Sequence, residues 1–80
     1  MRATVLVRPK EGILDPQGDA VGHSLRKLGF DVATARVGRV IDLDVQADDA
    51  EGACREIERM CQELLANPLI ESFEIRVDES

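Results

Sequence analysis

An apolar stripe along residues 50–66 is the feature that most limits what this chain can fold into. Apolar residues recur there every three or four positions, which is the spacing of one face of an α-helix. Asp48 with Glu51 three residues later resembles a capping box with aspartate in the Ser/Thr role. Asn67-Pro68 ends the helix, because a residue before proline is pushed out of the α region. The stripe consists of Ala53, Cys54, Ile57, Met60, Cys61, Leu64 and Leu65.

Other segments alternate between apolar and polar residues, which is typical of β-strands that bury one face. They are residues 3–8, 40–45 and 73–77. Pro9 ends the first segment, because proline cannot donate to a sheet ladder. The run VATARVGRVIDLDV, residues 32–45, predicts a hairpin with Gly38-Arg39 in a type II′ turn, since glycine suits the first central position. Residues 32–37 are therefore expected to form a further strand.

A first helix is expected to begin at Asp15-Pro16. Asp15 can cap the exposed amides, and Pro16 suits the first helical position, where its missing N–H costs nothing. Gly29 is a good C-terminal stop. The preceding Ile13 and Leu14 resemble a hydrophobic staple. The apolar stripe of this helix consists of Val21, Leu25 and Leu28.

The resulting order of elements is β-α-β-β-α-β within one domain of residues 1–80. This order predicts an α+β, ferredoxin-like sandwich: a four-stranded antiparallel sheet with two helices on one face. The other sheet face has no cover within the chain and carries aliphatic side chains with charges of both signs. An antiparallel sheet can leave such a face in water, but we expect self-association through this face or through a sheet edge. The candidate residues are Leu6, Arg8, Val40, Asp42 and Asp44.

The composition disfavours several classes of function. The net charge is −6 and the only aromatic residues are Phe30 and Phe73, whereas nucleic-acid binding needs a basic footprint, often with stacking aromatics. No apolar stretch approaches the ~20 residues of a membrane span, so we expect a cytoplasmic chain. Cys54 and Cys61 lie about 10 Å apart on a helix, beyond the ~7 Å limit for a disulfide.

The sequence offers few groups for catalysis. The one histidine, His23, lies off the apolar stripe of its helix, and its neighbour Ser24 does not face it. Asp42 and Asp44 share a sheet face and could bind a metal or share a proton, although a solvated or ion-paired strand face is the simpler interpretation. No catalytic residue and no metal site are therefore predicted.

Two glycines near the start of the first helix require an explanation. The spacing of Gly12 and Gly18 matches no phosphate-binding loop, and Asp15 would repel an anion at the helix N-terminus. Gly18 and Gly22 each cost ~1 kcal/mol relative to alanine inside a helix. They indicate a close approach by another backbone. That backbone belongs either to the second helix of this chain or to a partner protein.

Several runs of the sequence, taken together, resemble the PurS family, the small subunit of bacterial and archaeal phosphoribosylformylglycinamidine (FGAM) synthase. The match covers nearly the whole chain in order and in spacing. Arg39 stands where a lysine is common in the family, and Phe73 where a tyrosine often occurs. The runs are Gly12-Ile13-Leu14-Asp15-Pro16-Gln17-Gly18, Leu28-Gly29-Phe30, Arg36-Val37-Gly38-Arg39 and Leu64-Leu65-Ala66-Asn67-Pro68-Leu69-Ile70-Glu71.

The resemblance implies a role in purine biosynthesis. A glutaminase subunit releases ammonia, a large ATP-dependent synthetase subunit uses it, and the small subunit contacts both, helps to assemble them and assists ammonia transfer. The resemblance implies a homodimer or tetramer that is not catalytic alone and binds no cofactor, within a ligase complex that uses ATP and magnesium. The candidate partner contacts are Asp15, Gln17, Gly18, Gly22, Arg36, Arg39 and Asn67.

Two other functions are compatible with the residues alone. The first is an ACT-like small-molecule-binding regulatory domain, which shares the β-α-β-β-α-β order and would use the glycines near the first helix. The second is a self-contained enzyme that uses Asp42 and Asp44.

Overall fold

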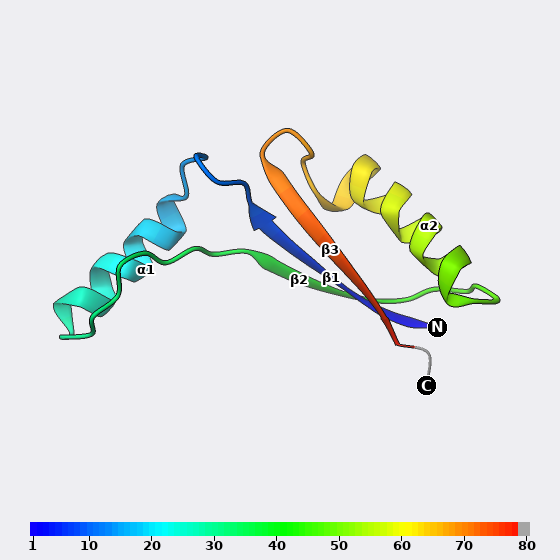
Figure 1. Cartoon of the computed structure of the whole chain (residues 1–80), viewed down its shortest axis with the longest axis horizontal. Helices are drawn as coiled ribbons and strands as arrows, with labels where there is room; N and C mark the ends of the chain where they lie inside the picture. The colour runs from blue at the N-terminus through cyan, green and yellow to red at the C-terminus, as the bar shows by residue number, and fades with distance from the viewer. Residues whose placement is uncertain (79–80) are drawn as a thin grey trace.

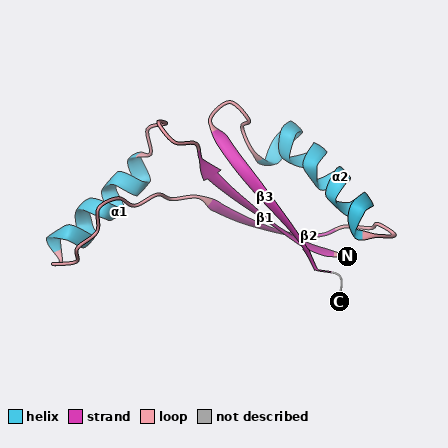
Figure 2. Ribbon diagram, in the orientation of Figure 1, coloured by secondary structure: helices cyan, strands magenta, loops and turns pink. Residues whose placement is uncertain are grey.

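The computed structural model describes residues 1–78 and shows a small sheet with one helix packed on it and a second helix held away from it (Figure 1, Figure 2). The elements are β1 (Arg2–Pro9), α1 (Pro16–Lys27), β2 (Arg39–Asp44), α2 (Ala50–Met60), the π-helical turn η1 (Cys61–Leu65) and β3 (Glu71–Asp78). The predicted helix over residues 50–66 is confirmed, with its last turn π-helical. Its cap is Asp49 rather than Asp48, because the Asp49 carboxylate accepts the Gly52 amide at 2.7 Å.

The sheet has the strand order β2-β1-β3, and both pairings are antiparallel. Val5 of the central strand β1 lies opposite Ile41 of β2 and Ile75 of β3. Because alternate side chains of a strand share a face, residues 3, 5 and 7 all point toward α2. The buried core lies between this face and α2, and consists of Ala3, Val5, Val7, Val45, Ala53, Ile57, Cys61 and Ala66.

The predicted fourth strand is wrong: within residues 1–78 the sheet has three strands, and residues 31–37 form none of them. The predicted turn at Gly38-Arg39 is absent as well, because Arg39 already begins β2 opposite Val7. Gly38 lies directly against the Val7 carbonyl, where a Cβ would collide with the oxygen. The chain therefore enters β2 without reversing, and residues 31–37 return along α1 instead.

The prediction that both helices cover one sheet face is also wrong, since only α2 covers it and α1 lies beyond the end of the sheet (Figure 1). The radius of gyration is 15.7 Å, against about 11.6 Å for a compact domain of this length. We call residues 16–37, which contain α1 and the return segment 31–37, the arm. Gly29, at φ +97°, ends α1 in the predicted way: its amide and that of Phe30 donate to Arg26 and Leu25 carbonyls, a Schellman motif.

Candidate functional site

Asp15 fixes the base of the arm. Its Oδ1 accepts the Gly18 amide at 2.9 Å, which confirms the predicted helix cap, and Pro16 occupies the first helical position. Its Oδ2 accepts the Val37 amide, also at 2.9 Å. These two backbone hydrogen bonds, Gly18 first, favour the charged carboxylate and lower the pKa of Asp15. The Asp15 side chain therefore caps α1 and also joins the end of the return segment to the start of α1.

The two glycines of α1 mark the contact between the helix and the return segment. A Cβ on Gly18 would lie 2.5 Å from the Ala35 carbonyl oxygen and 2.9 Å from the Arg36 Cα. Both Gly18 and Gly22 are buried. The close approach expected from the sequence is therefore internal, and its partner is residues 35–36 rather than α2. Any contact of these glycines with another protein stays a prediction.

Arg36 belongs to this contact, and Gln17 precedes Gly18 in α1. The Arg36 guanidinium donates to the Pro9 carbonyl at the end of β1, so it links the return segment to the sheet. Gln17 is exposed on the first turn of α1. Leu14, one of the two residues of the predicted hydrophobic staple, is 87% exposed, so this residue does not form the staple contact.

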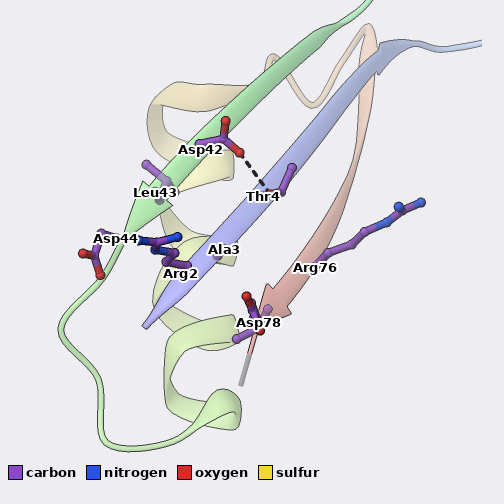
Figure 3. Close-up of a pocket in the computed structure, with 9 residues that line it drawn as sticks. Arg2, Ala3, Thr4, Asp42, Leu43, Asp44, Arg76 and Asp78 are labelled. Carbon is purple, nitrogen blue, oxygen red and sulfur yellow. Dashed lines mark hydrogen bonds between the residues drawn. The ribbon is translucent and has the colours of Figure 1, made fainter. Parts of the chain in front are cut away.

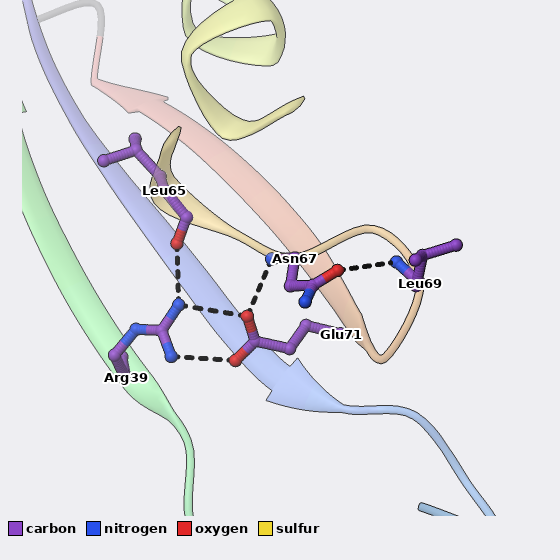
Figure 4. A network of polar contacts seen from close by, with 5 residues as sticks. All are labelled: Arg39, Leu65, Asn67, Leu69 and Glu71. Carbon is purple, nitrogen blue, oxygen red and sulfur yellow. Dashed lines mark hydrogen bonds and ion pairs between the residues drawn. The ribbon is translucent and has the colours of Figure 1, made fainter. Parts of the chain in front are cut away.

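Arg39 lies at the centre of a polar network that joins β2, η1 and β3 (Figure 4). Its guanidinium pairs with both Glu71 carboxylate oxygens, at 2.8 and 3.2 Å, and donates to the Leu65 carbonyl at 2.7 Å. Glu71 Oε1 also accepts the Asn67 amide at 2.8 Å, and Asn67 Oδ1 accepts the Leu69 amide at 3.1 Å. The Arg39 hydrogen bond first, and the Asn67 amide second, lower the pKa of Glu71.

A shallow groove brings several of the predicted partner contacts together. Asp15, Gln17 and Arg39 line it, although Asp15 and Arg39 come from opposite ends of the arm. Sequence reasoning did not assign its other members to a shared surface, because they come from separate stretches of the chain with no common periodic signal. They are Pro9, Ile13, Leu14, Pro16, Val37, Gly38, Ile70 and Glu71. We call this the base groove. Gly18, Gly22 and Arg36 lie outside it, and Asn67 is linked to it through Glu71.

A second hollow lies on the sheet face opposite α2, and we call that side the open face (Figure 3). Thr4 Oγ1 donates to Asp42 Oδ1 at 3.0 Å, whereas Asp44 accepts the chain's terminal amine at 3.2 Å. The two aspartates therefore have separate partners. The hollow is lined by Arg2, Ala3, Thr4, Asp42, Leu43, Asp44, Arg76, Val77 and Asp78. Of the other predicted self-association residues, Leu6 and Val40 face each other on the open face, and Arg8 pairs there with Glu74 at 3.8 Å.

Neither hollow contains a catalytic constellation. Among residues 1–78, no group of three or more His, Cys, Asp or Glu side chains could hold a metal ion. Cys54 and Cys61 are both free, as predicted. Cys61 is buried in the core, and burial raises the pKa of its thiol, which keeps it protonated and inert. No helix in the described part of the chain is long and apolar enough to cross a membrane.

The fold and the two hollows define a class: a small α+β protein with a three-stranded antiparallel sheet, one packed helix and one extended helix, in which residues 1–78 hold no group of three or more His, Cys, Asp or Glu that could bind a metal ion. The chain belongs to the PurS family, whose model, described as phosphoribosylformylglycinamidine (FGAM) synthase, matches residues 2–79. It is 37% identical over 79 residues to the PurS subunit of this synthase from Methanocaldococcus jannaschii, covering 98% of this chain and 95% of the relative. It is 44% identical to that of Archaeoglobus fulgidus, with 94% and 95% covered.

Solved structures of this family have the same fold. The crystal structure of Methanocaldococcus jannaschii PurS superposes with a TM-score of 0.86 at 36% identity, covering 99% of this chain and 96% of that one. A chain in the structure of PurLQS from Thermotoga maritima gives a TM-score of 0.86 at 33% identity, with 94% and 93% covered. The extended arm is therefore compatible with the fold of solved PurS chains.

Proposed function

We propose that this chain is the non-catalytic small subunit of an FGAM synthase complex in de novo purine biosynthesis. In this role it bridges a glutaminase subunit and a large ATP-dependent synthetase subunit and assists ammonia transfer between them. The observation that carries the proposal is the PurS family match over residues 2–79, supported by the likeness to a chain of PurLQS from Thermotoga maritima.

We assign the contact with a larger subunit to the base groove. Its walls combine exposed apolar side chains, Leu14 and Ile70, with the hydrogen-bonding groups of Gln17 and Arg39. An apolar centre with a polar rim is the usual composition of a protein–protein interface. Asp15 lines the groove itself and caps α1. The other predicted contacts hold the groove in place through the helix contact, the link to Pro9 and the Glu71 network; they are Gly18, Gly22, Arg36 and Asn67.

We assign self-association, as a dimer or tetramer, to the open face. Val40 is 64% exposed there beside Leu6, and charges of both signs surround the pair. Arg8 on one copy and Asp42 or Asp44 on another would be complementary across such an interface. The subunit itself is proposed to be cytoplasmic and to bind no cofactor, with ATP and magnesium used by the larger subunits of the complex.

The experiment that tests the proposal is reconstitution with the glutaminase and synthetase subunits of the same organism. Glutamine-dependent formation of the amidine product is expected to require this chain. Turnover with added ammonia is expected to change less, because free ammonia does not need transfer between subunits. Equal glutamine-dependent rates with and without the chain would contradict the proposal. The mass of the mixture, with and without glutamine and ADP, reports assembly separately from turnover.

The two alternative functions are less well supported. The match over residues 2–79 and the missing fourth strand do not favour an ACT-like regulatory domain. An enzyme based on Asp42 and Asp44 would need cooperating carboxylates, yet Thr4 and the terminal amine engage them separately. An Asp42→Asn, Asp44→Asn variant with unchanged activity in the complex would dispose of this second alternative.

A further inference from the structure

A further hollow, of about 430 Å³, lies where the sheet meets the arm. Arg8, Arg36 and Arg39 line it, whereas no carboxylate of residues 1–78 does. The chain has 16 acidic and 10 basic side chains, and both the base groove and the hollow of Figure 3 include carboxylates. Arginine as the only charged lining therefore sets this surface apart, and we call it the arginine hollow. Its remaining lining residues are Leu6, Val7, Pro9, Val37, Gly38 and Val40.

The guanidiniums of Arg8 and Arg36 can each take a further partner, because a guanidinium has five N–H donors. Arg36 uses Nη2 on the Pro9 carbonyl, which fixes its guanidinium beside the end of β1. Arg8 is 62% exposed and lies 3.8 Å from Glu74, which is longer than a hydrogen bond. Arg39, by contrast, is held on the α2 side of the sheet by the network of Figure 4. The hollow therefore offers two guanidiniums to an anionic group.

The mixed lining of the arginine hollow favours a protein segment as its occupant. Leu6 and Val40 lie opposite each other on the open face, and Arg8 follows Leu6 on the same side of β1. A free phosphate or carboxylate would contact the guanidiniums but would leave these aliphatic side chains uncovered. An acidic segment of a protein can do both, because an apolar residue beside its carboxylates covers Leu6 and Val40. Arginine and apolar side chains together are also typical of protein–protein interfaces.

The arginine hollow and the base groove lie on opposite sides of the same part of the chain. Arg39 is opposite Val7, on the side of α2, and pairs there with Glu71 of the base groove. Leu6 and Arg8 are on the other side, because alternate residues of a strand point to opposite faces. A subunit that bridges two larger proteins needs two separate contact surfaces, and this end of the molecule has both. The residues that line both hollows are Pro9, Val37, Gly38 and Arg39.

We propose that the arginine hollow binds an acidic segment of one of the larger synthase subunits, whose carboxylates pair with Arg8 and Arg36. Guanidinium–carboxylate pairs are charge-assisted hydrogen bonds and are often bidentate, so they fix the orientation of the segment. The net charge of the chain is −6, so most of its surface repels such a segment and the hollow determines where it binds. The inference rests on the proposed function, and it names the second contact surface that bridging requires.

The first test measures assembly while this chain is titrated into the glutaminase and synthetase subunits, with glutamine and ADP present. Arg8→Gln is expected to raise the concentration for half-maximal assembly about tenfold, because a hydrogen-bonded charge is lost, and to reduce its dependence on salt. Arg36→Gln is expected to act in the same direction. Arg55→Gln is the matched control, because Arg55 is exposed and forms a similar ion pair, at 3.9 Å with Glu51 of α2. An effect of Arg8→Gln no larger than that of Arg55→Gln would overturn the proposal.

Two further readouts separate this proposal from those made above. A saturating concentration of Arg8→Gln should restore glutamine-dependent turnover, since the change weakens docking and removes no reacting group. An unmodified chain that neither assembles nor supports turnover would contradict the proposed function itself, whereas arginine variants that behave like Arg55→Gln contradict the hollow alone. The mass of each isolated variant reports self-association. A fall in that mass for Arg8→Gln without weaker assembly would assign Arg8 to a second copy and overturn the proposal.

The second test identifies what lies in the hollow of the assembled complex. Arg8→Lys keeps the positive charge and supplies an amine, which a carbodiimide couples to a neighbouring carboxylate as an amide. Glu74→Gln is added to prevent coupling within the chain, and the chain has only two lysines of its own. Mass spectrometry is expected to find a new amide to an acidic segment of a larger subunit, absent from the control Arg55→Lys with Glu51→Gln. Coupling confined to a second copy of this chain, or none above the control, would overturn the proposal.

Discussion

The carboxylate of Asp15 accepts the backbone amide of Val37 at 2.9 Å, and so joins the two ends of the arm. The same carboxylate caps α1 through the Gly18 amide. The cap stabilises the start of the helix, whereas the bond to Val37 sets the direction in which the chain leaves the arm and enters β2. A single side chain thus links local helix formation to the placement of the whole arm.

Asp15→Ala is expected to loosen the arm as well as uncap α1. Loss of a helix cap lowers the melting temperature of a domain of this size by roughly 4–8 °C. Hydrogen exchange should show faster exchange at the Gly18 and Val37 amides together. Asp15→Asn keeps one oxygen acceptor, so its melting temperature should lie between those of Asp15→Ala and the unmodified chain. Asp49→Ala, which removes the cap of α2 alone, is the control, with faster exchange at Gly52 only. Unchanged protection of the Val37 amide in Asp15→Ala would contradict this linkage.

Gly18→Ala and Gly22→Ala are expected to have opposite effects. At Gly18 a Cβ would collide with backbone atoms of Ala35 and Arg36, which cannot shift without disturbing the contact. The free energy of unfolding is therefore expected to fall by about 1–3 kcal/mol. At Gly22 the nearest atom is the flexible Arg26 Nη1 at 3.2 Å, and Ala35 Cβ lies at 3.6 Å. There the higher helix propensity of alanine should make the change neutral or stabilising by up to ~1 kcal/mol. Chemical unfolding measures the free energy of unfolding of both variants. Equal changes in Gly18→Ala and Gly22→Ala would contradict the tight contact between Gly18 and residues 35–36.

The local elements of this fold could be predicted from the sequence, but their pairing could not. The stripe around Ile57 and the cap and stop at Asp15 and Gly29 depend on neighbouring residues, and the structure confirms them. Residues 32–37 have the composition of a strand, and the pattern indicates only an extended backbone. Whether such a segment turns at Gly38 or continues depends on the Val7 carbonyl, which is distant in sequence.

The candidate site, too, could be predicted in its individual residues but not in the long-range contacts between them. The resemblance to a known family placed Asp15, Gln17 and Arg39 among the partner contacts, and the structure brings these three to one groove. The bond from Val37 could not be predicted, because a backbone amide carries no residue-specific signal and lies 22 residues from Asp15. The pairing of Arg39 with Glu71 spans 32 residues and is likewise invisible in the local pattern.

Stability is expected to fall on acidification partly through Glu71. Its folded-state pKa lies below the ordinary value of 4.5 because Arg39 and the Asn67 amide favour the carboxylate. A carboxyl of this kind contributes stability above its unfolded pKa, and that contribution is lost as pH falls through the folded pKa. Melting temperatures recorded from neutral pH to below pH 4.5 should therefore fall less steeply for Glu71→Gln than for the unmodified chain. Glu63→Gln, which affects only the exposed pair with Arg59, is the control, and parallel curves for all three proteins would contradict the role of Glu71.

Val40→Glu is expected to weaken self-association through the open face without unfolding the chain. Val40 is exposed and lies opposite Leu6, whose other neighbour across the sheet is Glu74. The new carboxylate removes an apolar contact and adds a charge close to Asp42 and Glu74, so a second open face would meet like charges. The mass in solution should fall, whereas Leu64→Glu, at an exposed apolar residue of η1, should leave it unchanged. An undiminished mass for Val40→Glu would remove the open face as a self-association surface.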